Sequence, residues 1–175
     1  MKVIEAFFDG CCGPTNPGGY AGWGIVVKMD GRVLHRGSAY VGHGPLMSNN
    51  VSEARGAIAA MRWVMAAHLT GKFILKGDSL IVIRKLSRGR LACSGHGLYW
   101  PHMCEALGLV PLIDRQFENR VAFNWIPREE NAEADELSQR AIPADGRTMV
   151  ASTDLDHRLA YLLSKDEEGR QRRLF

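Results

Sequence analysis

The amino-acid sequence predicts an α/β domain built on a five-stranded mixed sheet that is flanked by helices. Near the N-terminus, three apolar segments of strand length follow one another with only short turns between them, which is typical of antiparallel neighbours. Two later segments of strand length are preceded by stretches of helical periodicity, as expected for parallel strands joined by right-handed crossovers. The predicted order is therefore βββαβααβα, followed by a C-terminal extension.

The first three strands are predicted by apolar runs and by turn residues. Residues 2–10 read K-V-I-E-A-F-F-D-G, and the small and turn-forming residues of 11–19 predict that this strand ends there. Residues 20–29 form the second apolar run. Asp30-Gly31 is a hairpin-turn pair that leads into the third strand at residues 32–41.

The rest of the core alternates between helical and strand patterns. Apolar residues recur at helical spacing from residue 50 to about residue 68. Asn131 is a candidate N-cap of the last core helix, and Pro101 fits the first turn of an earlier helix. We expect strands at residues 73–76 and 121–126, and helices at residues 80–86, 99–107, 131–141 and, beyond the core, 154–163.

Composition favours a soluble, cytoplasmic protein with one main domain. A hydrophobic share of 46% in 175 residues is enough for one core; we expect it to span residues 1–142, with an extension at 143–175 whose charged distal part is disordered. Adjacent Cys11 and Cys12 favour a reducing compartment. No run approaches the ~20 apolar residues that cross a bilayer, so no membrane partner is expected. The net charge of +3 permits a polyanionic partner.

Acidic residues stand where four predicted strands or helices end or begin. Asp9 and Asp78 each follow an apolar strand, and parallel neighbouring strands would bring both to one edge of the sheet. Glu53 lies in the first turn of a helix that would pack across this sheet, and Asp135 lies one turn into the last core helix. Because clustered like charges are costly unless cations neutralise them, convergence of these acids implies bound metal, and oxygen ligands favour Mg²⁺ or Mn²⁺.

Each acid also has a purely structural explanation. Residues 50–53, N-V-S-E, form a capping box that would account for Glu53. Asp135 would complement the helix dipole, while Asp9 and Asp78 would be turn residues before Gly and Ser. The combination of all four acids with this strand order favours a shared site.

The chain resembles type 1 ribonuclease H from Val3 to about Ala141. The resemblance rests on four blocks in the family's order: F-F-D-G with the following N-P-G-G-Y, then S-N-N-V-S-E-A, G-D-S, and E-N-A-E-A-D-E-L-S. It implies the ribonuclease H-like fold and a hydrolase in which two divalent ions clamp the attacking and leaving oxygens of a phosphoryl displacement. It also implies that the catalytic, metal-binding residues are Asp9, Glu53, Asp78 and Asp135.

The implied substrate is the RNA strand of an RNA–DNA hybrid, which a protein can distinguish from DNA through its 2′-hydroxyls. The resemblance assigns contacts with the nucleic acid to the backbone of residues 10–12 and to side chains of the loops that follow. The alternative for the asparagines is turn and cap formation. The expected substrate-binding residues are Gly10, Cys11, Cys12, Asn16, Ser48 and Asn49.

One loop departs from the pattern of many bacterial relatives of this family, and the end of the chain carries a further motif. The loop W-I-P-R-E-E-N at residues 125–131 lacks their histidine, and Arg128 or Glu129 is the candidate auxiliary residue in its place; the alternative is that both are solvated loop charges. The chain ends in Q-R-R-L-F, which resembles short peptides that dock on a replication sliding clamp. Gln171, Leu174 and Phe175 would make that contact; the alternative is an ordinary ragged terminus.

Two other functions fit the same fold. One is a different metal-dependent nuclease or strand-transfer enzyme, and the other is a noncatalytic module that binds RNA–DNA hybrids. A binding module would be expected to lose one or more of the four acids, and none is missing here. A monomer is the expected state.

Overall fold

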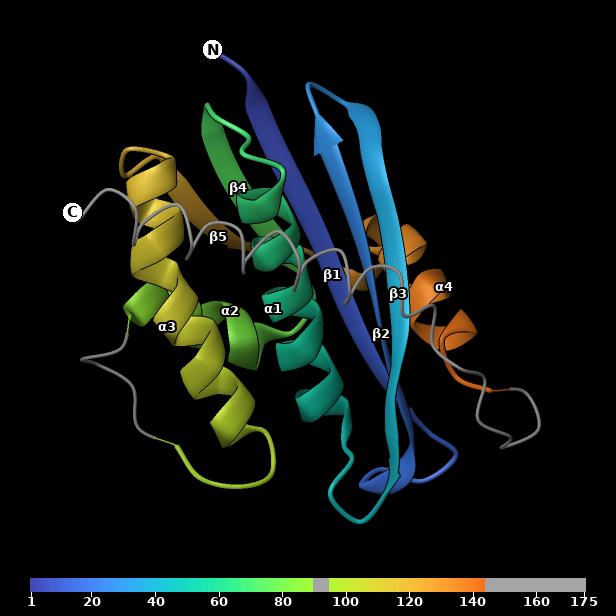
Figure 1. Ribbon diagram of the computed structural model, residues 1–175. Helices are drawn as coiled ribbons and strands as arrows, with labels where there is room; N and C mark the ends of the chain where they lie inside the picture. Colours follow the sequence, from blue (N-terminus) through green and yellow to red (C-terminus); the bar gives the residue numbers. More distant parts are fainter. Residues whose placement is uncertain (90–94, 144–175) are drawn as a thin grey trace, which may run out of the picture.

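The computed structural model describes residues 1–89 and 95–143, and these form the expected mixed sheet with helices on both faces (Figure 1). The five strands lie in the order β3-β2-β1-β4-β5. Neighbouring strands among the first three are antiparallel, whereas β4 is parallel to both β1 and β5, as predicted. The strands are β1 (Val3–Gly13), β2 (Gly18–Met29), β3 (Arg32–Gly44), β4 (Lys72–Gly77) and β5 (Val121–Trp125).

Helices α1 and α3 lie on one side of the sheet and α4 lies on the other (Figure 1). Successive side chains of β1 point to opposite faces of the sheet, so this one strand contacts helices on both sides. Gly10 lies against α1, and its neighbour Cys11 contacts α4. The helices are α1 (Asn49–Ala66), α2 (Leu80–Arg88), α3 (Trp100–Gln116) and α4 (Ala132–Arg140), with a short 3₁₀ turn, η2 (Arg128–Glu130), before α4.

The hydrophobic core lies between the sheet and the layer of α1, α2 and α3. Alternate residues of the central strands, such as Phe8 in β1 and Phe73 in β4, are fully buried there with Met61 of α1 and Met103 of α3. Burial of these large side chains supplies the main driving force that holds α1 on β1. The strand that carries Asp9 is therefore held firmly from one side.

Strand β1 does not end at residue 10 as predicted; it continues to Gly13. Cys11, Cys12 and Gly13 pair with Gly22, Ala21 and Tyr20 of β2, respectively. The ladder with β2 thus overrides the small and turn-forming residues of this stretch. β3 likewise extends beyond the expected residue 41, to Gly44.

Helix α3 was predicted to end near residue 107, but it continues to Gln116 through Gly108 and Pro111. The reason is burial: Ile113 is inside the core and Phe117, directly after the helix, stacks on Phe73 with ring centroids 5.3 Å apart. Tertiary packing outweighs the low helix propensities of glycine and proline here. Pro101 lies in the first turn, as expected.

The start of α1 also differs from the prediction. Ser48 is its N-cap, and the Ser48 Oγ accepts a hydrogen bond from the Val51 backbone N–H at 3.3 Å. The capping box expected at residues 50–53 is therefore wrong, and Glu53 lies just beyond the first turn, where it is buried. A structural role as a capping residue does not account for Glu53.

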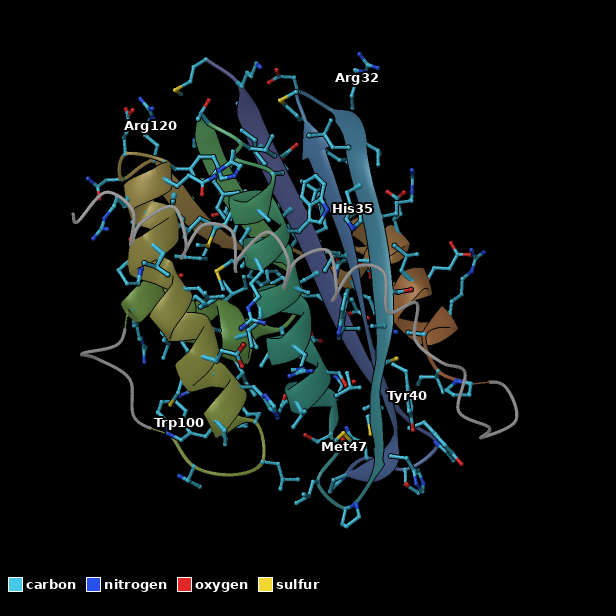
Figure 2. All side chains as sticks on the ribbon, viewed as in Figure 1. Arg32, His35, Tyr40, Met47, Trp100 and Arg120 are labelled. Atoms are coloured by element: carbon cyan, nitrogen blue, oxygen red, sulfur yellow. The ribbon has the colours of Figure 1, made fainter. Side chains whose placement is uncertain are left out.

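Arg32 and Arg120 mark the end of the sheet at which β1 begins, and Tyr40 and Met47 lie toward the opposite end (Figure 2).

None of the helices in the described part of the chain combines the length and the apolar character needed to cross a membrane. The expected helix at residues 154–163 and the clamp-like tail of Gln171, Leu174 and Phe175 lie outside the described residues.

Candidate active site

Three carboxylates from distant parts of the sequence meet beside β1, where strand β4 ends. Asp9, Glu53 and Asp78 each offer one oxygen, and these three oxygens all lie within 4.8 Å of one another. Asp9 and Glu53 are each only 4% exposed. A group of three acids at this spacing is suited to hold a divalent cation through oxygen ligands.

The register of the sheet explains why Asp9 and Asp78 meet. Phe8 of β1 pairs with Gly77 of β4, and these are the last paired residues of the two parallel strands. The next residue on each strand is an aspartate, so both carboxylates emerge where β4 ends. Asp78 follows its strand as predicted, whereas Asp9 lies within β1, which continues along β2.

Glu53 reaches this position because α1 lies directly on the backbone of β1 at Gly10. A Cβ atom at Gly10 would lie 2.2 Å from the Glu53 backbone nitrogen and 2.4 Å from the Ser52 carbonyl carbon. No other residue type fits at this contact. The Ser52 hydroxyl adds a hydrogen bond to the Cys11 carbonyl oxygen at 2.9 Å, on the same stretch of β1.

Burial and mutual repulsion raise the pKa values of two carboxyl groups in the cluster. Burial raises the pKa of Asp9 to about 7. The hydrogen bond from Ser138 opposes this rise, and the charges of Asp78 and Asp135 add to it. Burial, and then the charge of Asp9, raises the pKa of Glu53 well above its ordinary value. The buried Glu53 Oε2 has no hydrogen-bond partner among the described residues. A bound divalent cation would relieve both the repulsion and the unpaired oxygen, so the residues present fit such an ion.

Asp135 lies beside this group rather than inside it. Its Oδ1 accepts a hydrogen bond from the Arg128 guanidinium, and its Oδ2 accepts one from Gln139 Nε2 at 2.6 Å. Its charge still contributes to the raised pKa values of Asp9 and Glu53. Arg128, which projects from η2, therefore supplies positive charge at the edge of the site, and the ion pair holds Asp135 next to the three converging acids.

Two residues support the site in a way that the sequence analysis did not predict: Asn131, expected only as an N-cap, and Ser138. Asn131 lies at the N-cap position of α4, but its side chain makes no capping bond. Instead its buried amide donates to the Phe8 carbonyl oxygen at 2.9 Å and to Asp78 Oδ1 at 3.0 Å. Ser138, which is fully buried, places its Oγ 2.5 Å from Asp9 Oδ2. Their spacing from Asp135 on one face of a helix was the available signal.

Trp125 is a third residue that the sequence analysis did not single out. Its indole Nε1 donates to the Asp78 backbone carbonyl oxygen at 2.9 Å. This bond links the end of β5 to the residue that carries the third carboxylate.

The residues expected to contact nucleic acid have structural partners in the protein. Asn16 Oδ1 accepts a hydrogen bond from the Asn49 backbone N–H at 3.0 Å, which joins the β1–β2 loop to the start of α1. The Cys11 thiol donates to the Ser138 carbonyl oxygen at 2.9 Å, and the Cys12 thiol donates to the Thr15 carbonyl oxygen at 3.3 Å. Gly10 is buried beneath α1, whereas Asn16 is exposed; Glu129 is exposed in η2.

Comparison with known proteins places most of the chain in one family. The model of a family described as reverse transcriptase-like matches residues 7–141. The bifunctional protein Rv2228c of Mycobacterium tuberculosis is 26% identical over 155 residues, which is 88% of this chain and 39% of that protein. The chain therefore spans about two fifths of the length of the curated relatives that it matches.

Solved structures with the same architecture include two ribonuclease H domains. The N-terminal RNase H domain of Rv2228c from M. tuberculosis, solved as a fusion with maltose-binding protein, has a TM-score of 0.65 and 26% identity; the match covers 81% of this chain and 94% of that one. LC11-RNase H1, isolated from compost by a metagenomic approach and solved in complex with an RNA/DNA hybrid, has a TM-score of 0.63 and 29% identity, covering 79% of this chain and 96% of that one.

Proposed function

The chain belongs to the reverse transcriptase-like family and has the type 1 ribonuclease H fold, and from this premise we propose that it is a metal-dependent endoribonuclease that cuts the RNA strand of RNA–DNA hybrids. One observation carries the proposal: oxygens of Asp9, Glu53 and Asp78 lie within 4.8 Å of one another in a largely buried position. Nothing in the packing of a core requires three such acids to meet.

The residues that would hold the metal are Asp9, Glu53, Asp78 and Asp135, with Mg²⁺ as the proposed ion and Mn²⁺ as a substitute. When bound, two divalent ions would stabilise charge on the attacking and leaving oxygens of the phosphoryl group. The protein contributes fixed ligands: Asn131 and Ser138 restrain Asp78 and Asp9 through side-chain hydrogen bonds. Burial of Asp9 and Glu53 keeps water away and strengthens their interaction with a cation.

The substrate would lie across the end of the sheet near residues 10–16 and the start of α1. We assign contacts with the hybrid to the backbone of Gly10, Cys11 and Cys12 and to Asn16, Ser48 and Asn49. The bond from the Asn49 N–H to Asn16 Oδ1 supports this assignment, because it holds the two loops together on one surface. Arg128 is the proposed auxiliary residue, since its guanidinium pairs with Asp135 at the edge of the site. Glu129 is the weaker candidate.

A cleavage assay tests the proposed function. The protein is incubated with labelled RNA–DNA hybrid, double-stranded RNA or double-stranded DNA, in Mg²⁺, Mn²⁺ or chelator. We expect cleavage of the hybrid's RNA strand alone, lost on chelation and in Asp9→Asn, which keeps the shape and removes the charge. Glu136→Gln is the matched control, because Glu136 is an exposed acid next to Asp135 that pairs with Arg140.

The same assay discriminates the alternatives. Cleavage of double-stranded DNA would indicate a different nuclease on this fold. Binding of the hybrid without cleavage, in every metal tested, would indicate a noncatalytic module. Either result would overturn the proposed activity.

Further proposals concern the whole protein. We propose that it acts as a monomer in the cytoplasm, and that a C-terminal tail with Gln171, Leu174 and Phe175 docks on a replication sliding clamp. The support for the tail is its sequence, a charged segment that ends in an apolar Leu-Phe pair. A pull-down with purified clamp, comparing the full chain with one that lacks Leu174 and Phe175, tests it; equal capture would dismiss the clamp.

A further inference from the structure

Ser138 lies where helix α4 contacts β1, the strand that carries Asp9. Its side chain is fully buried, and its Oγ lies 2.5 Å from Asp9 Oδ2. Ser138 is one turn of α4 beyond Asp135, so the same helix face carries both residues toward β1. The serine thus connects a carboxylate on the sheet to the helix that carries a second one.

Packing fixes the position of Ser138 independently of its hydroxyl. Helix α4 lies directly on β2 because Gly22 and Gly24 have no side chains there. A Cβ at Gly22 would lie 2.8 Å from the Ser138 carbonyl oxygen, and a Cβ at Gly24 would lie 2.5 Å from the Ser138 nitrogen. The Cys11 thiol donates to that same carbonyl oxygen at 2.9 Å. The hydroxyl is therefore held at Asp9 by the backbone around it.

A serine hydroxyl has one hydrogen to donate, and two acceptors compete for it. One is Asp9 Oδ2, and the other is the Asp135 backbone carbonyl oxygen at 2.9 Å. An ionised carboxylate is the stronger acceptor, because charge-assisted hydrogen bonds are shorter and stronger than neutral ones. When Asp9 is ionised, as a metal ligand must be, the hydrogen is donated to Asp9.

We propose that Ser138 is a positioning residue for Asp9: its buried hydroxyl binds one carboxylate oxygen and so fixes the direction in which Asp9 faces a metal ion shared with Glu53 and Asp78. This inference rests on the proposed metal-dependent function. It assigns to Ser138 the same kind of role for Asp9 that the Asn131 amide has for Asp78. Loss of such a supporting hydrogen bond typically costs about 10–100-fold in metal affinity or activity.

Titration with Mn²⁺ tests the inference without relying on catalysis. We compare the unaltered protein with Ser138→Ala, using calorimetry for binding and circular dichroism for folding. The expected result is a Kd for Mn²⁺ that rises about 10–100-fold in Ser138→Ala. In the cleavage assay, the Mn²⁺ concentration for half-maximal activity rises by the same factor, while KM for the hybrid stays unchanged.

Ser52→Ala is the matched control. Ser52 is also fully buried, and its hydroxyl also donates across a helix–strand contact to β1, but it binds the Cys11 carbonyl oxygen rather than a carboxylate. Its loss is expected to lower stability and to leave the Kd for Mn²⁺ within about twofold of the original, since no ligand is released. Ser138→Cys, which nearly preserves volume and offers only a weak donor, is the second variant in case Ser138→Ala does not fold.

The outcomes separate this inference from the proposed function. Failure of the unaltered protein to bind Mn²⁺ would overturn the metal site itself. Binding of Mn²⁺ by the unaltered protein, with equal affinity in the folded Ser138 variants, would overturn the role of Ser138 alone. A selective loss of affinity in the Ser138 variants, but not in Ser52→Ala, supports both.

Discussion

Arg128 and Asp135 form an ion pair at the edge of the carboxylate cluster. The pair joins the 3₁₀ turn η2 to the first turn of α4. Burial and the neighbouring acids raise the pKa of Glu53 well above its ordinary value, and the positive charge of Arg128 offsets part of that rise. The carboxylate cluster therefore has a positive charge of the protein at its edge.

Replacing Arg128 by alanine should slow cleavage of the hybrid by about tenfold, equivalent to about 1.4 kcal/mol in the activation barrier. The physical reason is loss of the charge that orients Asp135 beside the site. Arg128→Lys should recover only part of the rate, because lysine keeps the positive charge but does not reproduce the fixed geometry of the guanidinium. Initial rates at saturating Mg²⁺ measure this; equal rates for all three proteins would remove Arg128 from the mechanism.

Replacing Asn131 by alanine should destabilise the protein by about 1–3 kcal/mol, because the buried Phe8 carbonyl oxygen would lose its side-chain donor and Asp78 would lose a restraint. Urea unfolding in chelator measures the change. Asn124→Ala, at an exposed position of β5, is the control and should change stability little. Equal effects of the two substitutions would show that the Asn131 bonds are not important for stability.

Replacing Gly10 by alanine should separate α1 from β1 and abolish activity. The added Cβ would meet backbone atoms of Ser52 and Glu53, which cannot move aside as a flexible side chain can. Overpacking of this kind costs about 1–3 kcal/mol or more. Gly13→Ala is the matched control on the same strand, because a Cβ there would meet nothing within 4 Å. Thermal unfolding and cleavage assays should distinguish them; a fully active Gly10→Ala protein would contradict the packing argument.

The metal-free protein should lose stability as pH rises. The pKa of Asp9 is about 7 in the folded protein against 3.8 ordinarily, so between these values the folded state holds a proton that the unfolded chain has released. Stability is then highest below the ordinary pKa and falls as pH rises toward 7. Burial acts on Glu53 in the same direction. Added Mg²⁺ should restore the stability lost at high pH.

Asp9→Asn isolates this effect. Asparagine resembles the protonated acid, so in chelator the variant should match the unaltered protein near pH 4 and unfold at a temperature higher by roughly 5 °C or more near pH 8. Differential scanning calorimetry across this pH range measures the difference. A difference in unfolding temperature that does not vary with pH would mean that the Asp9 pKa is not raised.

Much of this architecture could be predicted because local signals agree with it. Apolar runs and the Asp30-Gly31 turn predict the three antiparallel strands, and the crossover rule then makes β4 parallel to β1. That pairing alone brings Asp9 and Asp78 together. The extension of β1 to Gly13 could not be predicted, because it depends on a long-range ladder with β2 across a stretch of turn-forming residues.

The contacts that Asn131 and Ser138 make with the site could not be predicted from the sequence, because they too depend on long-range packing. Asn131, at the N-cap of α4, and Ser138, within α4, each lie one turn from Asp135, and the sequence carries that spacing. Whether the Ser138 hydroxyl touches Asp9 depends on how closely α4 lies on the sheet. Gly22 and Gly24 decide this distance from another strand, and neither belongs to a recognisable motif.

The most direct test of the central claim is a crystal structure of the protein grown with Mn²⁺, with the metal located by anomalous scattering. We expect an anomalous peak bonded to carboxylate oxygens of Asp9, Glu53 and Asp78 at roughly 2.0–2.3 Å, as for a hard cation with oxygen ligands. A well-ordered structure without a peak at these residues, or with Mn²⁺ bound only elsewhere, would contradict it.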